Sequence, residues 1–207
     1  KMLSIRSLFK KKKDDGVRYL ALEDVVSTNN YCLQTLSRQP ADHDARMTVV
    51  TAEYQTAGKG QGTNSWESER GQNLLFSLLC HPLWVPVSLQ FILSEAVALA
   101  LYDVLSELTG DIAIKWPNDI YIGDRKVTGI LIENDLMGPY LSRSVIGIGL
   151  NHHPPHAAVL RKLTDNLRAE VGLHGLEHVC HRNPKQFRLA PVEIDEELLR
   201  VPVESTA

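Results

Sequence analysis

The sequence has few cysteines, and none in the paired spacing of a zinc ribbon or a redox motif. Its 3 cysteines among 207 residues, Cys32, Cys80 and Cys180, are odd in number and far apart. This usage argues against a disulfide scaffold and fits a reducing compartment. The sequence also lacks an apolar run near the ~20 residues of a membrane span, and it lacks a secretory signal pattern. These absences predict a cytoplasmic protein with no membrane partner.

An excess of basic charge is missing as well. The formal net charge is -3, whereas a general nucleic-acid binder is usually basic. The run Lys10–Lys13 is followed at once by Asp14 and Asp15, so we interpret residues 1–16 as a frayed basic leader. We expect no DNA-binding helix-turn-helix ahead of Arg18, because that leader is too short to form one, and therefore no DNA partner.

Short apolar and β-branched runs between turn residues predict several strands. These strands lie at Arg18–Leu22, Met47–Tyr54, Asn73–Cys80, Ile112–Lys115, Ile120–Ile122, Lys126–Asn134 and Ser144–Leu150. Gly123-Asp124-Arg125 predicts the turn of a hairpin, because Gly and Asp supply turn geometry. The segment 55–72, rich in Gly, Ser and Asn, predicts a long loop.

Three helices are predicted, at about 27–37, 89–108 and 157–171. Ser27 caps the first helix and Ser88 caps the second. The second helix is apolar over most of its circumference, and its Glu95 and Asp103 favour a buried core helix over a membrane span. Since strands outnumber helices and several are linked as hairpins, we predict an α+β fold. Its centre is a mixed, largely antiparallel sheet packed with helices.

Three segments carry the residue types that chemistry needs. Ala57-Gly58-Lys59-Gly60-Gln61-Gly62 combines backbone N–H groups that an anion can approach with one lysine, although a flexible surface loop has the same composition. In Lys115-Trp116-Pro117-Asn118-Asp119, the proline forces the chain out of the sheet, and the carboxylate could hold Mg²⁺ beside a phosphate. An ordinary charged turn is the alternative. In Gly147-Ile148-Gly149, the glycines indicate close approach of a ligand or another chain segment, or else a β-bulge.

Taken together, these segments resemble the biotin protein ligase family over about Arg18–Asn151. The matching pieces, in order, are Ser27-Thr28-Asn29, Gln55-Thr56-Ala57-Gly58-Lys59-Gly60, Asn64-Ser65-Trp66, Gly71-Gln72-Asn73-Leu74, Lys115-Trp116-Pro117-Asn118-Asp119, Lys126-Val127-Thr128-Gly129-Ile130-Leu131 with Glu133, and Gly147-Ile148-Gly149-Leu150-Asn151. The Lys-Trp-Pro-Asn-Asp segment with its downstream Lys-x-x-Gly-Ile-Leu is the most specific piece. The resemblance implies a fold like that of class II synthetases and biotin ligases.

The resemblance also implies an activity. Such an enzyme uses ATP and Mg²⁺ to form biotinyl-5′-AMP, and then transfers biotin to a lysine of a biotin carboxyl carrier protein domain. Catalytic roles are implied for Lys126, Lys59 and Asp119, with Asp119 as the Mg²⁺ ligand. The residues implied to bind biotin or the adenylate are Ser27, Thr28, Asn29, Gln55, Gly58, Gly60, Gln61, Trp66, Lys115, Asn118, Gly129, Gly147, Gly149 and Asn151.

The sequence departs from the family pattern at three places. The family loop carries several arginines, whereas Lys59, Gln61, Gly62 and Thr63 fill that stretch here, and lysine cannot grip a phosphate with two parallel hydrogen bonds. We therefore hypothesise that this loop retains the adenylate less tightly. The second departure is Asn151-His152-His153-Pro154-Pro155, where the family often continues Asn-Val-Asn. The third is the C-terminus, where many members carry a small all-β domain. We divide the chain into the leader 1–16, a catalytic domain 17–172 and a short C-terminal segment 173–207, with a reduced all-β domain as an alternative for that segment.

Other functions remain open at this stage. A lipoate or octanoate ligase or transferase shares the core architecture, and a non-catalytic biotin binder would keep the pocket without turnover. His152, His153, His156, His174, His178 and His181 are dense late in the chain, but we favour a solvated stretch over a zinc site, because paired cysteines are missing. We expect a monomer or a homodimer, and a free sheet edge near Ser144–Leu150 would support the dimer.

Overall fold

The computed structural model describes residues 17–36, 47–107 and 110–151. The predicted leader 1–16, the predicted helix at 157–171, the late histidines and the segment 173–207 lie outside the described residues.

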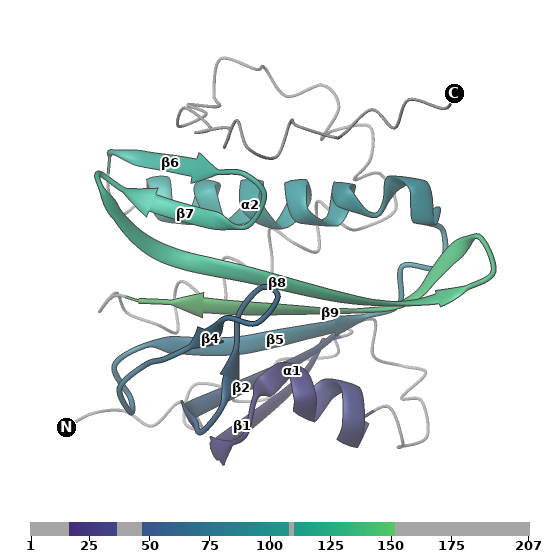
Figure 1. Cartoon of the computed structure of the whole chain (residues 1–207), viewed down its shortest axis with the longest axis horizontal. Coiled ribbons are helices and arrows are strands. Elements are labelled where there is room, and N and C mark those ends of the chain that lie inside the picture. The colour runs from purple at the N-terminus through teal and green to yellow at the C-terminus, as the bar shows by residue number, and fades with distance from the viewer. Residues whose placement is uncertain (1–16, 37–46, 108–109, 152–207) are drawn as a thin grey trace, which may run out of the picture.

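A seven-stranded sheet forms the centre of the molecule (Figure 1). Its strands, in order across the sheet, are β1 (Val17–Val25), β2 (Met47–Gln55), β5 (Leu74–Cys80), β9 (Tyr140–Leu150), β8 (Arg125–Met137), β7 (Asp119–Ile122) and β6 (Ile112–Lys115). The pair β1–β2 is parallel and every other neighbouring pair is antiparallel. The predicted mixed, largely antiparallel sheet is therefore confirmed.

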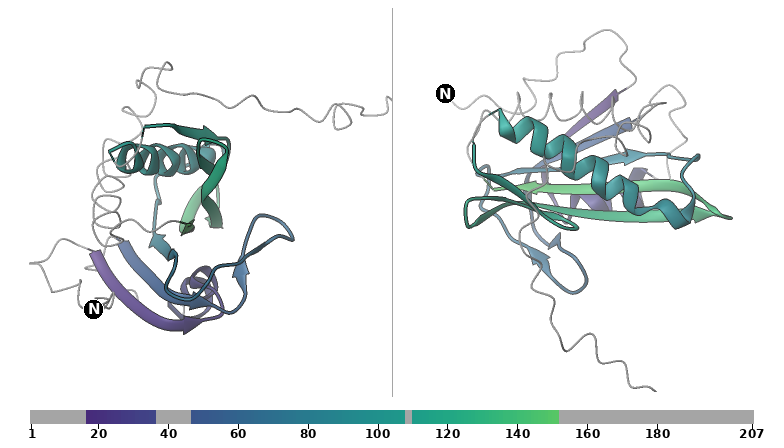
Figure 2. Two further views of the ribbon diagram at one scale, coloured as in Figure 1. Left: turned by 90° about the vertical axis from the view of Figure 1, so that its left-hand side faces the viewer. Right: turned by 90° about the horizontal axis from the view of Figure 1, so that it is seen from above.

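One face of the sheet is covered by the helix α2 (Phe91–Ser106), which Figure 2 shows lying across the strands. Side chains alternate between the two faces of a strand, so Ile146, Ile148 and Leu150, at alternate positions in the second half of β9, join α2 in the main core. The stretch Val87–Ser106, with a mean hydropathy of 1.5, is long and apolar enough to span a membrane by composition. Of its 9 buried residues in α2, Val97, Ala98, Ala100, Leu101, Val104 and Leu105 pack in this core, and Leu93 packs in a smaller cluster with Val85 and Leu141. This burial accounts for the apolar composition.

The opposite face carries a short helical segment, α1 (Thr28–Asn30) followed by the π-helical turn η2 (Tyr31–Thr35). The predicted cap is confirmed, because the Ser27 side chain accepts a hydrogen bond from the backbone N–H of Asn30 at 3.5 Å. A second, smaller core forms beneath η2 and includes Cys32, Val50 and Val145. The small hairpin of β3 (Gly58–Lys59) and β4 (Ser65–Trp66) stands beside this segment on the same face (Figure 1).

Three predictions about local structure need correction. The long helix does not begin after Ser88, which lies in the 3-10 turn η4 (Val87–Leu89); α2 begins at Phe91, and Gln90 before it provides no side-chain cap. The apolar residues at 89 and 91 suggested a buried helix start, but Leu89 is 49% exposed and Phe91 is 61% exposed.

The other two corrections concern the loop and the sheet edge. The predicted loop 55–72 begins inside β2 and contains the hairpin β3–β4, whose two-residue strands are too short to show a strand pattern. The strand at Ser144–Leu150 is no free edge, because β9 lies between β5 and β8. Within the part of the chain that the structure describes, the edges of this sheet are β1 and β6, so β9 offers no unpaired edge to support a dimer.

Candidate active site

A cleft opens on the sheet face that carries α1, between the start of that helix, the β3–β4 hairpin and the strands β8 and β9. Residues from segments far apart in the sequence line it: Ser27, Thr28, Asn29, Gln55, Lys59, Gly60, Gln61, Trp66, Asn118, Lys126, Gly129, Ile130, Leu131, Gly147, Ile148 and Gly149. The lining combines glycine backbone, hydrogen-bonding side chains and two lysines. This composition suits a ligand with an apolar body, polar ring atoms and an anionic end.

The inner end of the cleft holds a fixed group of polar side chains. Gln55 Oε1 accepts hydrogen bonds from the Thr28 backbone N–H at 2.7 Å and from Thr28 Oγ1 at 2.9 Å. Ser77 Oγ lies 2.7 Å from Thr28 Oγ1 and 2.6 Å from Asn29 Oδ1. A hydroxyl has one proton, so Ser77 donates to one of these oxygens at a time. Local helix geometry sets this end, because Ser27 caps α1 and thereby fixes Thr28 and Asn29 beside β2 and β5.

Asn29 extends the polar group towards β8. Its Nδ2 donates to Glu133 Oε2 at 2.8 Å and lies 3.4 Å from the Leu131 carbonyl oxygen. Only a glycine at 147 leaves room for this amide, since a Cβ there would lie 2.3 Å from Asn29 Oδ1. Asn29 is 3% exposed, and both ends of its amide are engaged with protein groups. We therefore assign it to the wall of the cleft.

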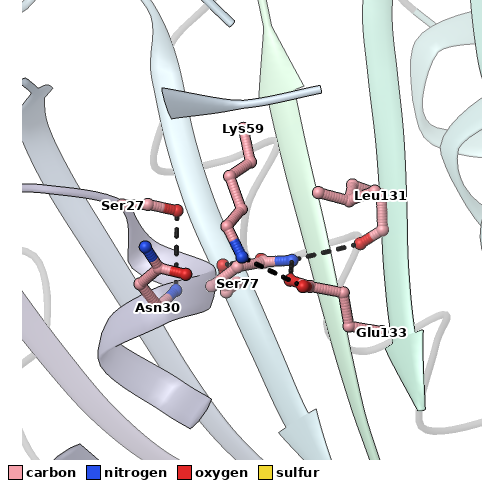
Figure 3. Close-up of polar contacts among 7 residues, drawn as sticks. Ser27, Asn30, Lys59, Ser77, Leu131 and Glu133 are labelled. Carbon is pink, nitrogen blue, oxygen red and sulfur yellow. Dashed lines mark hydrogen bonds and ion pairs between the residues drawn. The ribbon is translucent and has the colours of Figure 1, made fainter. Parts of the chain in front are cut away.

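An ion pair joins the glycine hairpin to β8. Lys59 Nζ on β3 lies 3.2 Å from Glu133 Oε1, and Figure 3 shows the two side chains pointing toward each other. The side chains are 41% and 29% exposed, respectively. The lysine of the glycine-rich segment thus faces the cleft, which favours the anion-site interpretation over a free surface loop.

A second ion pair lies at the other end of the cleft. Lys126 Nζ on β8 lies 2.7 Å from Asp119 Oδ1 on β7, and Asp119 is the more buried partner at 16% exposure. The turn 116–118 leaves the sheet after β6 as predicted from Pro117, and the Trp116–Pro117 peptide bond is cis. The Asn118 carbonyl accepts a hydrogen bond from the Ile130 N–H at 2.8 Å, which ties this turn to β8. Lys126, Asp119 and Asn118 therefore meet, as the sequence predicts.

Trp66 forms the outer wall of the cleft. Its ring packs on the glycine backbone of β8 and β9, where a Cβ on Gly129 would lie 2.6 Å and one on Gly149 2.3 Å from ring atoms. Lys126 Nζ lies 5.8 Å from the ring centroid, within cation–π range. The glycines in β9 thus admit side chains from other segments. The bulge alternative is wrong for them, because the register of β9 is regular through 144–150.

A second, wider cleft lies on the other side of Trp66. It is lined by Tyr54, Gln55, Thr56, Ala57, Gly58, Ser65, Trp66, Glu67, Ser68, Glu69, Gln72, Asn73 and Asn151. Trp66 and Gln55 border both clefts. The backbone N–H of Asn151 donates to the Val127 carbonyl at 2.7 Å, which fixes the end of β9 against β8.

Most of the predicted site residues come together in this arrangement. Gly58 and Asn151 border the second cleft instead of the first, and Asp119 reaches the first cleft through Lys126. Lys115 borders neither cleft; its ammonium lies 5.7 Å from the Tyr121 ring. Sequence reasoning assigned no role to Ser77 or Glu133. Ser77 is the one polar residue in the otherwise apolar strand β5, and this interruption was the signal by which the sequence could have revealed it.

The residues beside Lys126 suit a Mg²⁺ ion that is shared with a phosphate. Magnesium usually takes one or two protein carboxylates and completes its shell with phosphate oxygens and water. Asp119 supplies one carboxylate and Asn118 lies next to it in the chain. Within 17–36, 47–107 and 110–151, no group of three or more His, Cys, Asp or Glu gathers that could cage an ion alone.

The cysteines of the described segments are structural. Burial raises the pKa of Cys32 and of Cys80 to about 12, against an ordinary value of 9.0. The thiolate is the nucleophilic form, so neither residue is a nucleophile at neutral pH. The chemistry of the cleft therefore uses neither Cys32 nor Cys80.

Comparisons with known proteins agree with this geometry. The chain is 35% identical over 138 residues to the bifunctional ligase/repressor BirA of Escherichia coli, which covers 66% of this chain and 41% of that protein. It is 31% identical over 153 residues to the biotin–[acetyl-CoA-carboxylase] ligase of Mycobacterium tuberculosis, covering 72% of this chain and 56% of that one. The chain thus spans about two fifths to just over half of these relatives.

Solved structures share the fold. The biotin acetyl coenzyme A carboxylase synthetase of Helicobacter pylori superposes with a TM-score of 0.60 at 23% identity, covering 74% of each chain. The biotin protein ligase of Aquifex aeolicus gives a TM-score of 0.61 at 22% identity, covering 77% of this chain and 72% of that one. A sequence profile of the biotin/lipoate A/B protein ligase family matches residues 24–151, which include both clefts. The chain therefore belongs to the biotin/lipoate A/B protein ligase family.

Proposed function

We propose that the chain is the catalytic part of an ATP-dependent biotin–protein ligase. The observation that carries the proposal is the arrangement of the first cleft, with fixed hydrogen-bonding groups at its inner end and Lys59 and Lys126 nearer the hairpin and β7. The urea ring of biotin needs polar partners inside an otherwise apolar pocket, because an unpaired buried polar group costs about 1–3 kcal/mol. Thr28 and Gln55 provide such partners, and the lysines suit the carboxylate end.

The reaction joins two anions and then transfers an acyl group. A biotin carboxylate oxygen attacks the α-phosphate of ATP, pyrophosphate leaves, and a mixed anhydride with AMP forms. The amine of an acceptor lysine then attacks the acyl carbon, giving an amide and releasing AMP and a proton. Lys126 lies where it can balance the charge of the joined carboxylate and phosphate, since fixed charges that stabilise a developing anion are a large source of catalysis.

The remaining groups bind, orient and exclude water. A bound Mg²⁺, held by Asp119 with Asn118 beside it, would neutralise phosphate charge. Trp66 and the glycine hairpin cover the outer side of the cleft and would limit hydrolysis of the anhydride. Gly58 and Asn151, which border the second cleft, lie on the side from which a nucleotide or an acceptor can approach Trp66.

The proposal extends to the partners and the setting. The Mycobacterium tuberculosis relative is named for acetyl-CoA carboxylase, so we propose a biotin carboxyl carrier protein domain as the acceptor. We propose a cytoplasmic location, no DNA or membrane partner, and a monomer or homodimer. The division into 17–172 and 173–207 likewise remains a proposal, because the boundary between them lies outside the described residues.

Exchange of labelled pyrophosphate into ATP tests the first half-reaction. We expect biotin- and Mg²⁺-dependent exchange in the wild type. In Lys126→Ala, the exchange rate should fall on the order of 100-fold or more, the size of effect seen when one group that stabilises transition-state charge is removed. Arg125→Ala is the matched control. Arg125 is next to Lys126 in the sequence, but its side chain is exposed at the hairpin turn and borders neither cleft. Tight biotin binding without exchange in the wild type would identify a non-catalytic biotin binder.

A lipoate or octanoate ligase or transferase is the second candidate, since the name of the family includes lipoate. The inner end of the cleft favours biotin, because the dithiolane ring of lipoate has no hydrogen-bonding groups for Thr28 and Gln55. We expect biotin to bind at least ~10-fold more tightly than lipoate, on the order of one unmade hydrogen bond. Equal competition by lipoate for bound biotin would overturn this preference.

The arginine-poor hairpin leads to a further expectation about the adenylate. Lys59 acts as a point charge, and Gln61 and Gly62 add none, so we propose faster release of biotinyl-5′-AMP than from an arginine-rich loop. A Lys59→Arg, Gly62→Arg variant should retain the adenylate longer. Equal release rates from the variant and the wild type would contradict the proposal that the missing arginines speed adenylate release.

A further inference from the structure

A continuous set of polar contacts runs from the inner end of the cleft to the glycine hairpin. It passes from Gln55 to Thr28, then to Ser77 and Asn29, and then to the carboxylate of Glu133. The other oxygen of that carboxylate faces Lys59 Nζ at 3.2 Å (Figure 3). Glu133 is thus the point where the buried end of the cleft and the exposed hairpin meet.

The two oxygens of Glu133 serve different segments. Oε2 accepts from the buried Asn29 amide at 2.8 Å, which fixes the carboxylate on the α1 side of β8. Oε1 is left for the ammonium of Lys59 on β3. Because one oxygen is already fixed, the second is held in place for the lysine at little further cost in side-chain entropy.

The hairpin depends on few side chains to reach the sheet. Its base is anchored by backbone hydrogen bonds from Thr56 to Val25 and from Ala57 to Val26. Further out, Trp66 packs on the glycines of β8 and β9, and Lys59 reaches Glu133. The turn beyond, with Gly62 at φ 64°, is exposed.

We infer that Glu133 is a positioning residue that latches the glycine hairpin over the cleft through Lys59 and couples the hairpin to the ring-binding end through Asn29. Filling the inner end would order Thr28 and Asn29, and hence the carboxylate, which keeps the hairpin closed over the ligand. The coupling to ligand rests on the proposed function, whereas the latch itself does not.

Hydrogen–deuterium exchange of residues 57–66 in the ligand-free protein tests the latch. Glu133→Gln keeps a carbonyl oxygen for Asn29 but removes the charge that faces Lys59. We expect exchange to be about two- to fivefold faster than in the wild type at low salt, as for a partly exposed ion pair. The difference should disappear near 1 M salt, because the ion pair is screened there. Equal exchange at low salt, or an undiminished difference at high salt, would overturn the latch.

A matched control and a second variant separate the latch from general loosening of β8. Asp135→Asn also removes a carboxylate from β8, but its partner is Arg143 rather than a hairpin residue, so hairpin exchange should stay at the wild-type rate. Lys59→Met should speed exchange as Glu133→Gln does, and the double variant should exchange no faster than either single one. Additive effects, or faster hairpin exchange in Asp135→Asn, would contradict the inference.

Biotin binding then tests the coupling. Glu133→Gln should release biotin about two- to fivefold faster at low salt, with a smaller change in the association rate, because a latch acts on the closed state. An unchanged dissociation rate would overturn the coupling. A wild type that binds no biotin, yet shows the exchange pattern above, would overturn the proposed function and leave the latch standing.

Discussion

The substitution Gly147→Ala tests how firmly the protein holds Asn29. A Cβ on residue 147 lies 2.3 Å from Asn29 Oδ1, whereas ordinary van der Waals contact begins at 3.4 Å, so the amide must retreat by about 1.1 Å. β9 is paired on both sides and cannot yield easily. The amide is held by Ser77 at 2.6 Å and by Glu133 at 2.8 Å, and both hydrogen bonds must lengthen beyond useful range.

The size of the effect follows from these contacts. A neutral hydrogen bond is worth about 0.5–1.5 kcal/mol and one to a charged group about 1.5–3 kcal/mol, while overpacking a buried site costs about 1–3 kcal/mol. Partial relaxation offsets some of this sum, so we expect a loss of about 2–4 kcal/mol in the free energy of unfolding. For a domain of this size, that lowers Tm by about 5–15 °C.

Thermal unfolding followed by circular dichroism measures this shift. Gly110→Ala is the matched control, since a Cβ on that residue meets nothing within 4 Å, and its Tm should stay within about 2 °C of the wild type. Asn29→Ala removes the clashing amide, so Gly147→Ala should cost much less in that background. A Gly147→Ala protein that melts with the wild type would refute the claim that the amide is rigidly held.

Three further predictions concern the cleft, the core and the surface. Trp66→Ala should raise the biotin Kd, measured by calorimetry, about tenfold or more, because it removes the aromatic ring that packs over Gly129 and Gly149. An unchanged Kd would show that this ring does not contribute to biotin binding. Cys32 and Cys80 should resist alkylation at pH 8 until the protein is denatured, as peptide mass spectrometry would detect. Their folded pKa of about 12 exceeds the ordinary 9.0, so their contribution to stability should be constant below pH 9 and fall between pH 9 and 12, as unfolded thiols ionise. Arg70 forms an exposed ion pair with Asp24, and its hydrogen bond lowers the pKa of the Asp24 carboxyl. Because exposed ion pairs contribute little to stability, Arg70→Ala should leave Tm unchanged. A clear drop in Tm would show a structural role for this pair.

Local patterns account for the parts of the fold that the sequence predicts well. The apolar run of β5 and the turn Gly123-Asp124 between β7 and β8 appear where expected, because alternation, burial and turn chemistry are properties of neighbouring residues. Pairing across long sequence separations has no such signal. β9 pairs on one side with β8, its neighbour in the chain, but its pairing with β5 on the other side joins segments far apart in the sequence, so its position inside the sheet could not be predicted.

The same distinction holds for the site. Lys126 and Asp119 are paired because a hairpin joins their strands, so the sequence predicts their meeting. Glu133 meets Lys59 across 74 positions and Asn29 across 104, and neither contact follows from spacing. Lys115 precedes the turn, and its ammonium lies over the Tyr121 ring instead of lining either cleft, so its predicted role in binding stays a prediction.

The alternation in β9 makes this strand unusually sensitive to insertion or deletion. Ile146, Ile148 and Leu150 belong to the core beneath α2, while Gly147 and Gly149, which alternate with them, leave space for Asn29 and Trp66 on the other face. Adding or removing one residue before Ile146 would exchange the two sets, pressing bulky side chains into the cleft and leaving gaps in the core. Natural length variation should therefore be absent from this strand and tolerated at the exposed turn of the β3–β4 hairpin near Gly62.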